Sequence, residues 1–370
     1  MEKSKVYFTN LRTTPSSPNL LEKLENLVKK AGMEQIDFKK KFTAIKLHFG
    51  EPGNLAYLRP NYSKVIVDVV KSLGGKPFLT DCNTLYVGRR KDALEHIDTA
   101  YENGYNPFTL GCHIIIADGL KGTDEAYVPI NCEFVKEAKI GRAIMDSDII
   151  ISLSHFKGHE LTGFGGAIKN IGMGCGSRAG KMEMHNSGKP SVKENKCEGC
   201  GLCSRNCAHE AITIDKDRIA RISHDKCVGC GRCIGACSFD AIRANWDEAM
   251  GTACKKIAEY AYAAIKDKQS FHINFVLEVT PFCDCHSEND VAIIPDIGIF
   301  ASFDPVALDV ACVEAVNKAP VNRKSVLGEI QNLTDDYFTS IHPETNWKIC
   351  LDHAEKIGIG TKTYELIEIL

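Results

Sequence analysis

The sequence predicts an α/β fold, with a body built on a largely parallel sheet and a small α+β domain inserted into it. Short apolar segments alternate with amphipathic segments of helical period on both sides of the chain's middle. This alternation is typical of a parallel sheet covered by helices. Between the two halves stand two cysteine groups of identical spacing, flanked by polar linkers at 187–196 and 243–251. These observations predict one body in two parts, separated by a cysteine-rich insertion.

The first part of the body alternates regularly. Apolar residues recur every three or four positions in the segments expected to be helices. Strands are expected at 5–9, 43–49, 76–82 and 112–119, and helices at 19–32, 62–75 and 93–105. Residues 139–154 are expected to form a helix and then a strand that ends in IIISLS.

The second part continues the pattern after an alanine-rich helix at 247–266. Strands are expected at 271–280 and 291–302, and a helix at 304–317. Asp304 followed by Pro305 is the pattern of a helix N-cap with proline at the first helical position. Ligands of parallel sheets bind beyond the carboxyl ends of the strands, so we expect the functional site there.

Composition excludes several classes of protein. The chain has 370 residues, 44% of them hydrophobic and 25% charged, and a formal net charge of -3. Such a charge gives no general attraction to nucleic acid or membranes. No apolar run approaches the roughly 18 residues that cross a bilayer, and the first residues lack a secretory apolar segment. We therefore expect a cytoplasmic protein of two or three domains that has no membrane span and does not bind nucleic acid.

Seventeen cysteines is a high count for a reducing compartment, where thiols bind metal or stay free. Eight of them form two C-x2-C-x2-C-x3-C groups that start 30 residues apart, at Cys197, Cys200, Cys203 and Cys207 and at Cys227, Cys230, Cys233 and Cys237. The alternative is a pair of zinc sites, but zinc usually takes two C-x2-C pairs rather than this spacing.

The two groups resemble a bacterial two-cluster ferredoxin module. In that family, three cysteines of one group and the fourth of the other hold each [4Fe-4S] cluster. The resemblance implies one cluster on Cys197, Cys200, Cys203 and Cys237, and another on Cys227, Cys230, Cys233 and Cys207. Ala208 and Ser238 stand where the family often has proline.

The predicted domains are a body at 1–190 and 245–370 and the ferredoxin-like insertion at 191–244. The insertion carries nine Lys/Arg and seven Asp/Glu residues, whereas free ferredoxins are usually strongly acidic. We therefore interpret it as a built-in electron-transfer unit rather than a diffusing carrier.

A second candidate site is the glycine-rich stretch 154–176, SHFKGHELTGFGGAIKNIGMGCG. Closely spaced glycines before a helix let backbone amides bind an anion. The predicted anion-binding or substrate-binding residues are Lys157, Gly163, Gly165, Gly166 and, after another strand, Asp81, Asn83 and Thr84. The alternative is a loop that only packs tightly and whose histidines make structural hydrogen bonds.

Most of the chain resembles the family named domain of unknown function 362, often fused to ferredoxin modules. The resemblance rests on residues 154–174, on TDCNTLYVGRR at 80–90, on TPFCDC at 280–285 and on 294–309. It implies no settled activity.

The spacing of His159, Lys169 and His185 is similar to that of nickel-pincer lactate racemase. In that family these positions would be a proton-transfer histidine, a lysine that tethers the cofactor and a nickel-ligating histidine. The rest of the racemase pattern is absent from this sequence.

Cys283 and Cys285, in TPFCDCHSEND, follow the strand at 271–280. In an extended segment their sulfurs lie on one side, about 7 Å apart, and a bend would bring both to one metal. Three interpretations stay open: two buried thiols, a site for metal or a third cluster, and a redox-active thiol pair.

Together these features predict a ferredoxin-dependent reductase of an anionic substrate. Electrons from an external donor such as ferredoxin pass through the two clusters to catalytic residues in the body, namely His155, His159, Lys169 and His185. An additional metal or a flavin is compatible with the sequence. The alternatives are an accessory protein that docks to a larger redox enzyme, and a racemase-like metal-cofactor enzyme.

Overall fold

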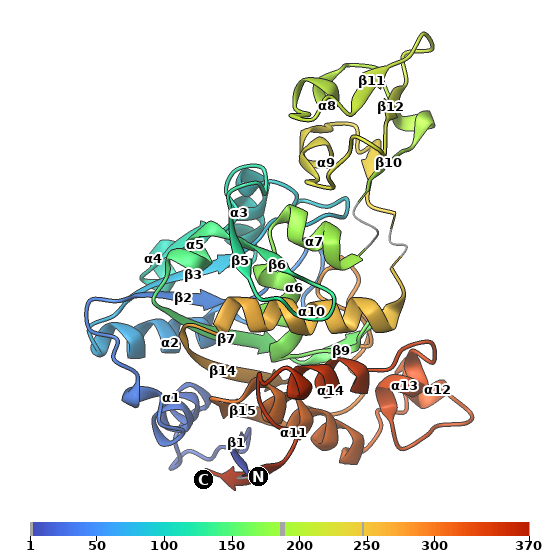
Figure 1. Ribbon diagram of the computed structural model, residues 1–370. Coiled ribbons are helices and arrows are strands. Elements are labelled where there is room, and N and C mark those ends of the chain that lie inside the picture. The colour runs from blue at the N-terminus through green and yellow to red at the C-terminus, as the bar shows by residue number, and fades with distance from the viewer. Residues whose placement is uncertain (1–2, 186–188, 246–247, 370) are drawn as a thin grey trace.

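An eight-stranded sheet forms the centre of the protein (Figure 1). The computed structural model describes residues 3–185, 189–245 and 248–369. The strand order is β16 (Tyr364–Glu368), β1 (Ser4–Asn10), β15 (Gly298–Ser302), β14 (Gln269–Val276), β7 (Ile149–His155), β2 (Phe42–Lys46), β3 (Lys76–Asp81) and β4 (His113–Ile116). Only β15 runs antiparallel to its neighbours, β1 and β14. The predicted α/β fold with a largely parallel sheet is confirmed.

Helices cover both faces of the sheet and make three layers. Side chains of a strand alternate between the faces, so Ile149 and Ile151 enter one core and Ile150 enters the other. The first core is covered by α1 (Leu20–Lys30), α2 (Pro60–Ser72), α3 (Ala93–Glu102) and α4 (Pro107–Leu110). The second is covered by α6 (Ala167–Cys175), α10 (Met250–Ile265), α11 (Pro305–Lys318) and α14 (Lys348–Lys356). Among the described residues, no helix combines the length and apolar character needed to cross a membrane.

Several elements depart from the sequence predictions. The helix expected near 139–147 is reduced to α5 (Arg142–Asp146), because the residues before it pair as β6 (Glu137–Gly141) with β5 (Glu125–Pro129). The glycine-rich stretch contains a hairpin of β8 (Lys157–His159) and β9 (Gly163–Gly165). The remaining body elements are η1 (Met33–Gln35), α7 (Arg178–His185), α12 (Val326–Glu329) and α13 (Tyr337–Ile341). Asp304 caps α11 as predicted.

The cysteine-rich segment forms a small unit beside the body (Figure 1). It contains β10 (Ser191–Val192), η2 (Glu194–Lys196), α8 (Leu202–Arg205), β11 (Ile212–Ile214), β12 (Ala220–Ile222), α9 (Arg232–Ala236) and β13 (Ile242–Arg243). Strand β10 pairs with β13, so the segment starts and ends at the same place, as an insertion requires. Positions 187–188 and 246–247 of the predicted linkers lie outside the described residues. The domain boundaries stay a prediction.

Four neighbouring parallel strands bring polar residues to one edge of the sheet. Strands β3, β2, β7 and β14 lie side by side and run in the same direction. Their last residues include Lys46, Asp81 and His155. The side chains that follow these strands therefore meet at one edge, where a large cavity lies.

Candidate functional site at the carboxyl edge of the sheet

A cavity of about 1150 Å³ lies where the body meets the cysteine-rich segment. Its wall combines the strand ends, the glycine-rich hairpin, the segment after β14 and part of the insertion. From the insertion come Gly235, Cys237, Ser238 and Asp240. Residues far apart in sequence, including Cys237 and Cys283, therefore face the same space.

Buried ion pairs occupy the strand ends. The Nζ atom of Lys46 lies 3.0 Å from Oδ1 of Asp81, and the Nε atom of Arg90 lies 2.8 Å from Oε2 of Glu51. Burial opposes ionisation of Asp81, but Lys46 and neighbouring cationic groups outweigh it and lower its pKa. Asp81 is therefore an anion whose charge is neutralised by Lys46, so it would repel a second anion rather than bind it. The prediction that Asp81 binds an anionic ligand is corrected.

The two residues predicted beside Asp81 separate in the structure. Asn83 is buried, and its backbone and side-chain amides both donate to Oδ1 of Asp118 at 2.9 Å. It secures the loop after β3 and does not line the cavity. Thr84 lines the cavity, and its backbone amide donates to the carbonyl of Arg90 at 2.9 Å.

The first two backbone amides of α6 are not free to bind a ligand. The amides of Ala167 and Ile168 donate to the Asp309 carboxylate at 2.7 and 3.0 Å. A Cβ on Gly166 would lie 2.3 Å from an oxygen of Asp309, so glycine is required for this approach. Gly163 has a φ of +78° and packs on Trp347. An internal carboxylate therefore occupies two amides of the helix start, and anion binding by Gly163, Gly165 and Gly166 stays a prediction.

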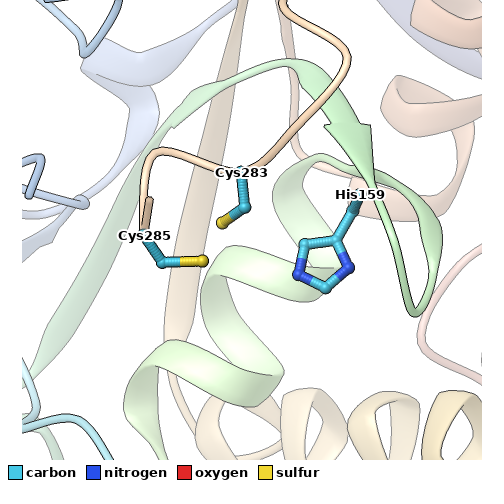
Figure 2. Close-up of side chains that lie close together, drawn as sticks. All are labelled: His159, Cys283 and Cys285. Atoms are coloured by element: carbon cyan, nitrogen blue, oxygen red, sulfur yellow. The ribbon is translucent and has the colours of Figure 1, made fainter. Parts of the chain in front are cut away.

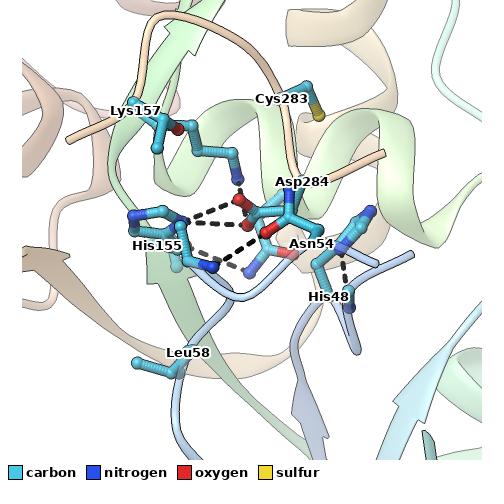
Figure 3. A network of polar contacts seen from close by, with 12 residues as sticks. His48, Asn54, Leu58, His155, Lys157, Cys283 and Asp284 are labelled. Carbon is cyan, nitrogen blue, oxygen red and sulfur yellow. Dashed lines mark hydrogen bonds and ion pairs between the residues drawn. The ribbon is translucent and has the colours of Figure 1, made fainter. Parts of the chain in front are cut away.

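His155 and Lys157 hold Asp284, the residue between the two cysteines (Figure 3). Nδ1 of His155 lies 2.9 Å from both oxygens of Asp284, and Nζ of Lys157 lies 3.2 Å from Oδ2. The other ring nitrogen of His155 faces the carbonyl of Leu277 at 2.8 Å. Both nitrogens therefore face acceptors, and the ring is committed to positioning Asp284. The predicted catalytic role of His155 becomes a positioning role, and Lys157 pairs with Asp284 instead of with a ligand.

Cys283 and Cys285 meet across a turn. The amide of His286 donates to the carbonyl of Cys283 at 3.1 Å, which bends the chain that would otherwise be extended. Figure 2 shows both sulfurs on one side of this turn, with the His159 ring pointing toward them. One ligand atom from each of the three residues lies within 4.8 Å of the others. A second such group contains Glu160, Cys285 and His286.

The two thiols differ in acidity. The Cys285 thiol hydrogen bonds to Cys283 and lowers its pKa well below the ordinary value, against the effect of burial and with the help of Lys169 and His159. The same hydrogen bond raises the pKa of Cys285. The Nζ atom of Lys169 lies 3.7 Å from Sγ of Cys283. Lys169 and this hydrogen bond therefore favour the thiolate form at Cys283 over the thiolate form at Cys285.

The hydrogen bonds of His159 define its tautomer. Its Nδ1 atom accepts from the amides of Leu161 at 3.0 Å and Thr162 at 3.3 Å. A nitrogen that accepts two hydrogen bonds carries no hydrogen, so Nε2 carries it in the neutral ring. Burial, followed by Lys169, lowers the pKa of His159 and favours this neutral form. His159 can therefore donate a hydrogen bond but is not poised to release a proton, which corrects its predicted proton-transfer role.

Lys169, Lys181 and His185 complete the cavity wall near the cysteines. Burial, Lys169 and His159 lower the pKa of His185 to about 3, so this ring is neutral. Lys181 donates to the carbonyl of Gly176 at 2.6 Å. Within the described ranges neither lysine forms an ion pair with a carboxylate. Both ammonium groups are therefore candidates to bind an anion, and Lys169 also contacts the sulfur of Cys283.

The eight clustered cysteines gather around two small cavities. One is lined by Cys197, Cys200, Cys203 and Cys237, and the other by Cys207, Cys227, Cys230 and Cys233. This crossed grouping is the one that the ferredoxin resemblance implies. Backbone amides of Ala220, Ala211 and Ala241 point at the sulfurs of Cys197, Cys207 and Cys237, at 3.3–3.4 Å. Such donors stabilise thiolate ligands, and the residues fit an iron–sulfur cluster at each place.

Sequence reasoning missed several residues of the cavity wall. Lys46 and His48 end or follow β2, and Arg90 ends a loop that gives no regular pattern. Nδ1 of His48 accepts from the amide of Gly50 at 3.0 Å. The one signal for Lys46 and His48 was their place at the carboxyl end of a predicted strand. Asp309 gave no sequence signal for its role, which is to cap α6.

Comparison with known proteins adds two likenesses of low similarity. No curated protein matches the chain. A crystal structure of a Thermotoga maritima protein has 15% identity and a TM-score of 0.42, covering 80% of this chain and 58% of that one. A lactate racemase apoprotein from Thermoanaerobacterium thermosaccharolyticum has 11% identity and a TM-score of 0.41, covering 86% and 58%. This chain thus spans less than two thirds of either protein.

Family comparison confirms the resemblance drawn from the motifs at 80–90, 154–174, 280–285 and 294–309. The matched region runs over residues 43–314, which is more than half of the chain. The protein therefore belongs to the family described as Domain of unknown function (DUF362).

Proposed function

We propose that this protein is an iron–sulfur enzyme that uses electrons from an external donor, such as a ferredoxin, to reduce an anionic small molecule in the large cavity. One observation carries the proposal: Cys237 lines both a four-cysteine cavity of the insertion and the large cavity that contains Cys283 and Cys285. When bound by the two cysteine sets, [4Fe-4S] clusters supply electrons one at a time.

The insertion is held against the cavity by specific contacts. Lys91 of the body donates to the carbonyl of Cys237 at 2.9 Å and pairs with Asp240. Arg178 is fully buried, and Gly235 lies so close that an added Cβ would be 3.2 Å from its Cζ atom. These contacts support a fixed approach of Cys237 to the reaction site, which electron delivery requires.

The cavity residues can bind and protonate an anion. The ammonium groups of Lys169 and Lys181 attract negative charge, and the enclosed site strengthens this attraction relative to water. Reduction of a double bond takes two electrons and two protons. Lys169 and the Cys285 thiol are the proton donors at the cavity wall, while neutral His159 donates a hydrogen bond. The substrate is therefore an anion that binds beside Lys169 and the cysteine pair.

Iron analysis of anaerobically purified protein tests the cluster assignment. We expect iron and acid-labile sulfide in equal amounts, and loss of about half of the iron in C237S. Cys132→Ser is the matched control, because Cys132 lies outside the cavities and bonds to the carbonyl of Ile130. Protein that contains zinc but no iron, or C237S with full iron content, would refute the assignment.

Thermal shift measurements test the anion site. Phosphate and small carboxylates, added as probes, should raise the melting temperature of the wild type and lose this effect in the K169M/K181M variant. Lys139→Met serves as control because Lys139 pairs with Glu183 and does not line the cavity. An equal shift in all three proteins would exclude Lys169 and Lys181 as the anion site.

A racemase-like enzyme is a second candidate function. His159, Lys169 and His185, the residues with racemase-like spacing, all line the same cavity. This candidate requires nickel or a bound cofactor in the body. Nickel in stoichiometric amount, lost in H185A with iron unchanged, would favour it over the reductase.

A further inference from the structure

We infer that Cys283 and Cys285 form a reversible disulfide that collects two electrons and passes them to the substrate. The inference rests on the proposed function for the source of its electrons. A cluster exchanges one electron at a time, whereas a dithiol–disulfide couple exchanges two. A dithiol in the cavity would therefore convert two single-electron deliveries into one two-electron reduction.

The turn places the two sulfurs for bond formation. The hydrogen bond from the His286 amide to the Cys283 carbonyl closes the turn, and the two sulfurs lie within 4.8 Å of each other. Cys283 is buried, with 2% of its surface exposed, yet it lines the cavity. A thiol of lowered pKa beside a second thiol is typical of redox-active cysteines. Forming the disulfide requires the two sulfurs to move from a separation within 4.8 Å to a bond of about 2 Å.

Charged and polar groups around the pair favour an asymmetric dithiol. Lys169 contacts the sulfur of Cys283 at 3.7 Å, and the ring of His159 points at it (Figure 2). Cys285 instead faces Glu160 and His286, which pair with each other at 2.9 Å. Cys283 is therefore the nucleophilic thiolate, and Cys285 is the thiol that exchanges a proton.

The chemical steps balance. Reduction breaks the S–S bond, takes two electrons and one proton, and leaves a Cys283 thiolate and a Cys285 thiol. In the second step the S–S bond forms again and the substrate gains two electrons. The substrate also gains two protons, one from Cys285 and one from the Lys169 ammonium group, which solvent then reprotonates. The reductant is the pair of reduced clusters, or a dithiol reagent in the assay.

A metal ion at His159, Cys283 and Cys285 is the rival reading of the same geometry. The tautomer of His159 argues against it. A histidine ligand offers a lone pair at the coordinating nitrogen and donates from the other one. Here Nδ1 accepts two amide hydrogen bonds, so Nε2 carries hydrogen and has no free lone pair.

Differential thiol labelling tests the inference on the full-length protein. The protein is equilibrated anaerobically in dithiothreitol buffers of graded potential, quenched in acid, denatured and labelled with a maleimide. Trypsin then releases residues 269–318, whose only cysteines are Cys283, Cys285 and Cys312. Cys312 is buried in the core and serves as the internal reference.

We expect the peptide to change from three labels to one in a single two-electron transition. The C285S and C283S variants should carry two labels at every potential. Three labels in the wild type at all potentials would overturn the inference. So would labelling that requires prior removal of stoichiometric zinc by a chelator.

Light-driven reduction separates this inference from the proposed function. With a photoreduced deazaflavin as electron donor, the oxidised wild type should regain three labels and C237S should not. Iron, sulfide and cluster absorbance are measured on the same samples. If the clusters bleach but the label count stays fixed, the inference fails and the proposed function stands. If iron is absent and the disulfide still cycles with dithiothreitol, the proposed function fails and the thiol pair stands.

Discussion

Replacing Lys169 by methionine should raise the pKa of the Cys283 thiol. The Nζ atom of Lys169 lies 3.7 Å from Sγ of Cys283, and both groups line the cavity. Methionine keeps the length and apolar stem of lysine and removes only the charge. The hydrogen bond from Cys285 remains, so the thiolate is weakened rather than abolished.

The magnitude follows from Coulomb's law. Unit charges 3.7 Å apart interact by about 4 kcal/mol at an effective dielectric constant of ~20, which corresponds to about three pH units. Water that enters the space of the ammonium group reduces this figure. We therefore expect the titration midpoint of Cys283 to rise by about one to three pH units, with at least tenfold slower alkylation below the new midpoint.

The assay is the rate of iodoacetamide modification of peptide 269–318, followed against pH by mass spectrometry. Lys169→Arg is the matched control, because it keeps the positive charge and should keep the midpoint near that of the wild type. An unchanged midpoint in K169M, in a variant of normal iron content and melting temperature, would refute the electrostatic account of the thiolate.

Three further predictions concern stability. Gly166→Ala should lower the free energy of unfolding by about 2–4 kcal/mol, because the added Cβ would lie 2.3 Å from the carboxylate that caps α6. Urea unfolding measures this change. Gly251→Ala is the control, because a Cβ at Gly251 would meet its nearest neighbour at 3.4 Å. Burial raises the pKa of Asp118 to about 6, so the folded state binds this proton more tightly than the unfolded state does. Proton binding at Asp118 therefore adds to the free energy of unfolding below about pH 4, and this stabilisation is lost as pH rises through about 6. Between about pH 4 and 6, the melting temperature of Asp118→Asn should change less with pH than that of the wild type. Parallel curves for the two proteins would contradict the raised pKa of Asp118. Lys46→Met should cost about 3–5 kcal/mol by leaving Asp81 as an uncompensated buried charge, and adding Asp81→Leu should restore most of it.

Local patterns in the sequence were sufficient for much of the fold. The cysteine spacing at 197–237 identifies the two cysteine groups, and the ferredoxin resemblance implies which thiols share a site. Apolar periodicity located most of the helices and strands that form the two cores, but not α14 or β16. Asp304 was identifiable as a cap because its partners are the amides two and three residues later.

The functional roles of the glycine-rich stretch could not be predicted in this way. Asp309 caps α6 from about 140 residues away along the chain. Because no local pattern reveals this internal carboxylate, the sequence pointed only to a bound ligand as the anion at these amides. His159 looked like a proton donor until the amides of Leu161 and Thr162 defined its tautomer. Whether a histidine nitrogen donates or accepts depends on which groups lie next to it in the folded protein, and the spacing of residues in the sequence does not show this.

The sequence by itself determined the fold class, the family and the eight clustered cysteines, because each of these depends on short-range periodicity or spacing. Only the tertiary structure decided that Cys237 and Cys283 line one cavity and that Lys169 lies against the cysteine pair. These contacts between distant residues depend on the strand order β14, β7, β2 and β3 and on where the insertion packs. Both are set by long-range packing, since burying two faces of one sheet decides which strand ends become neighbours.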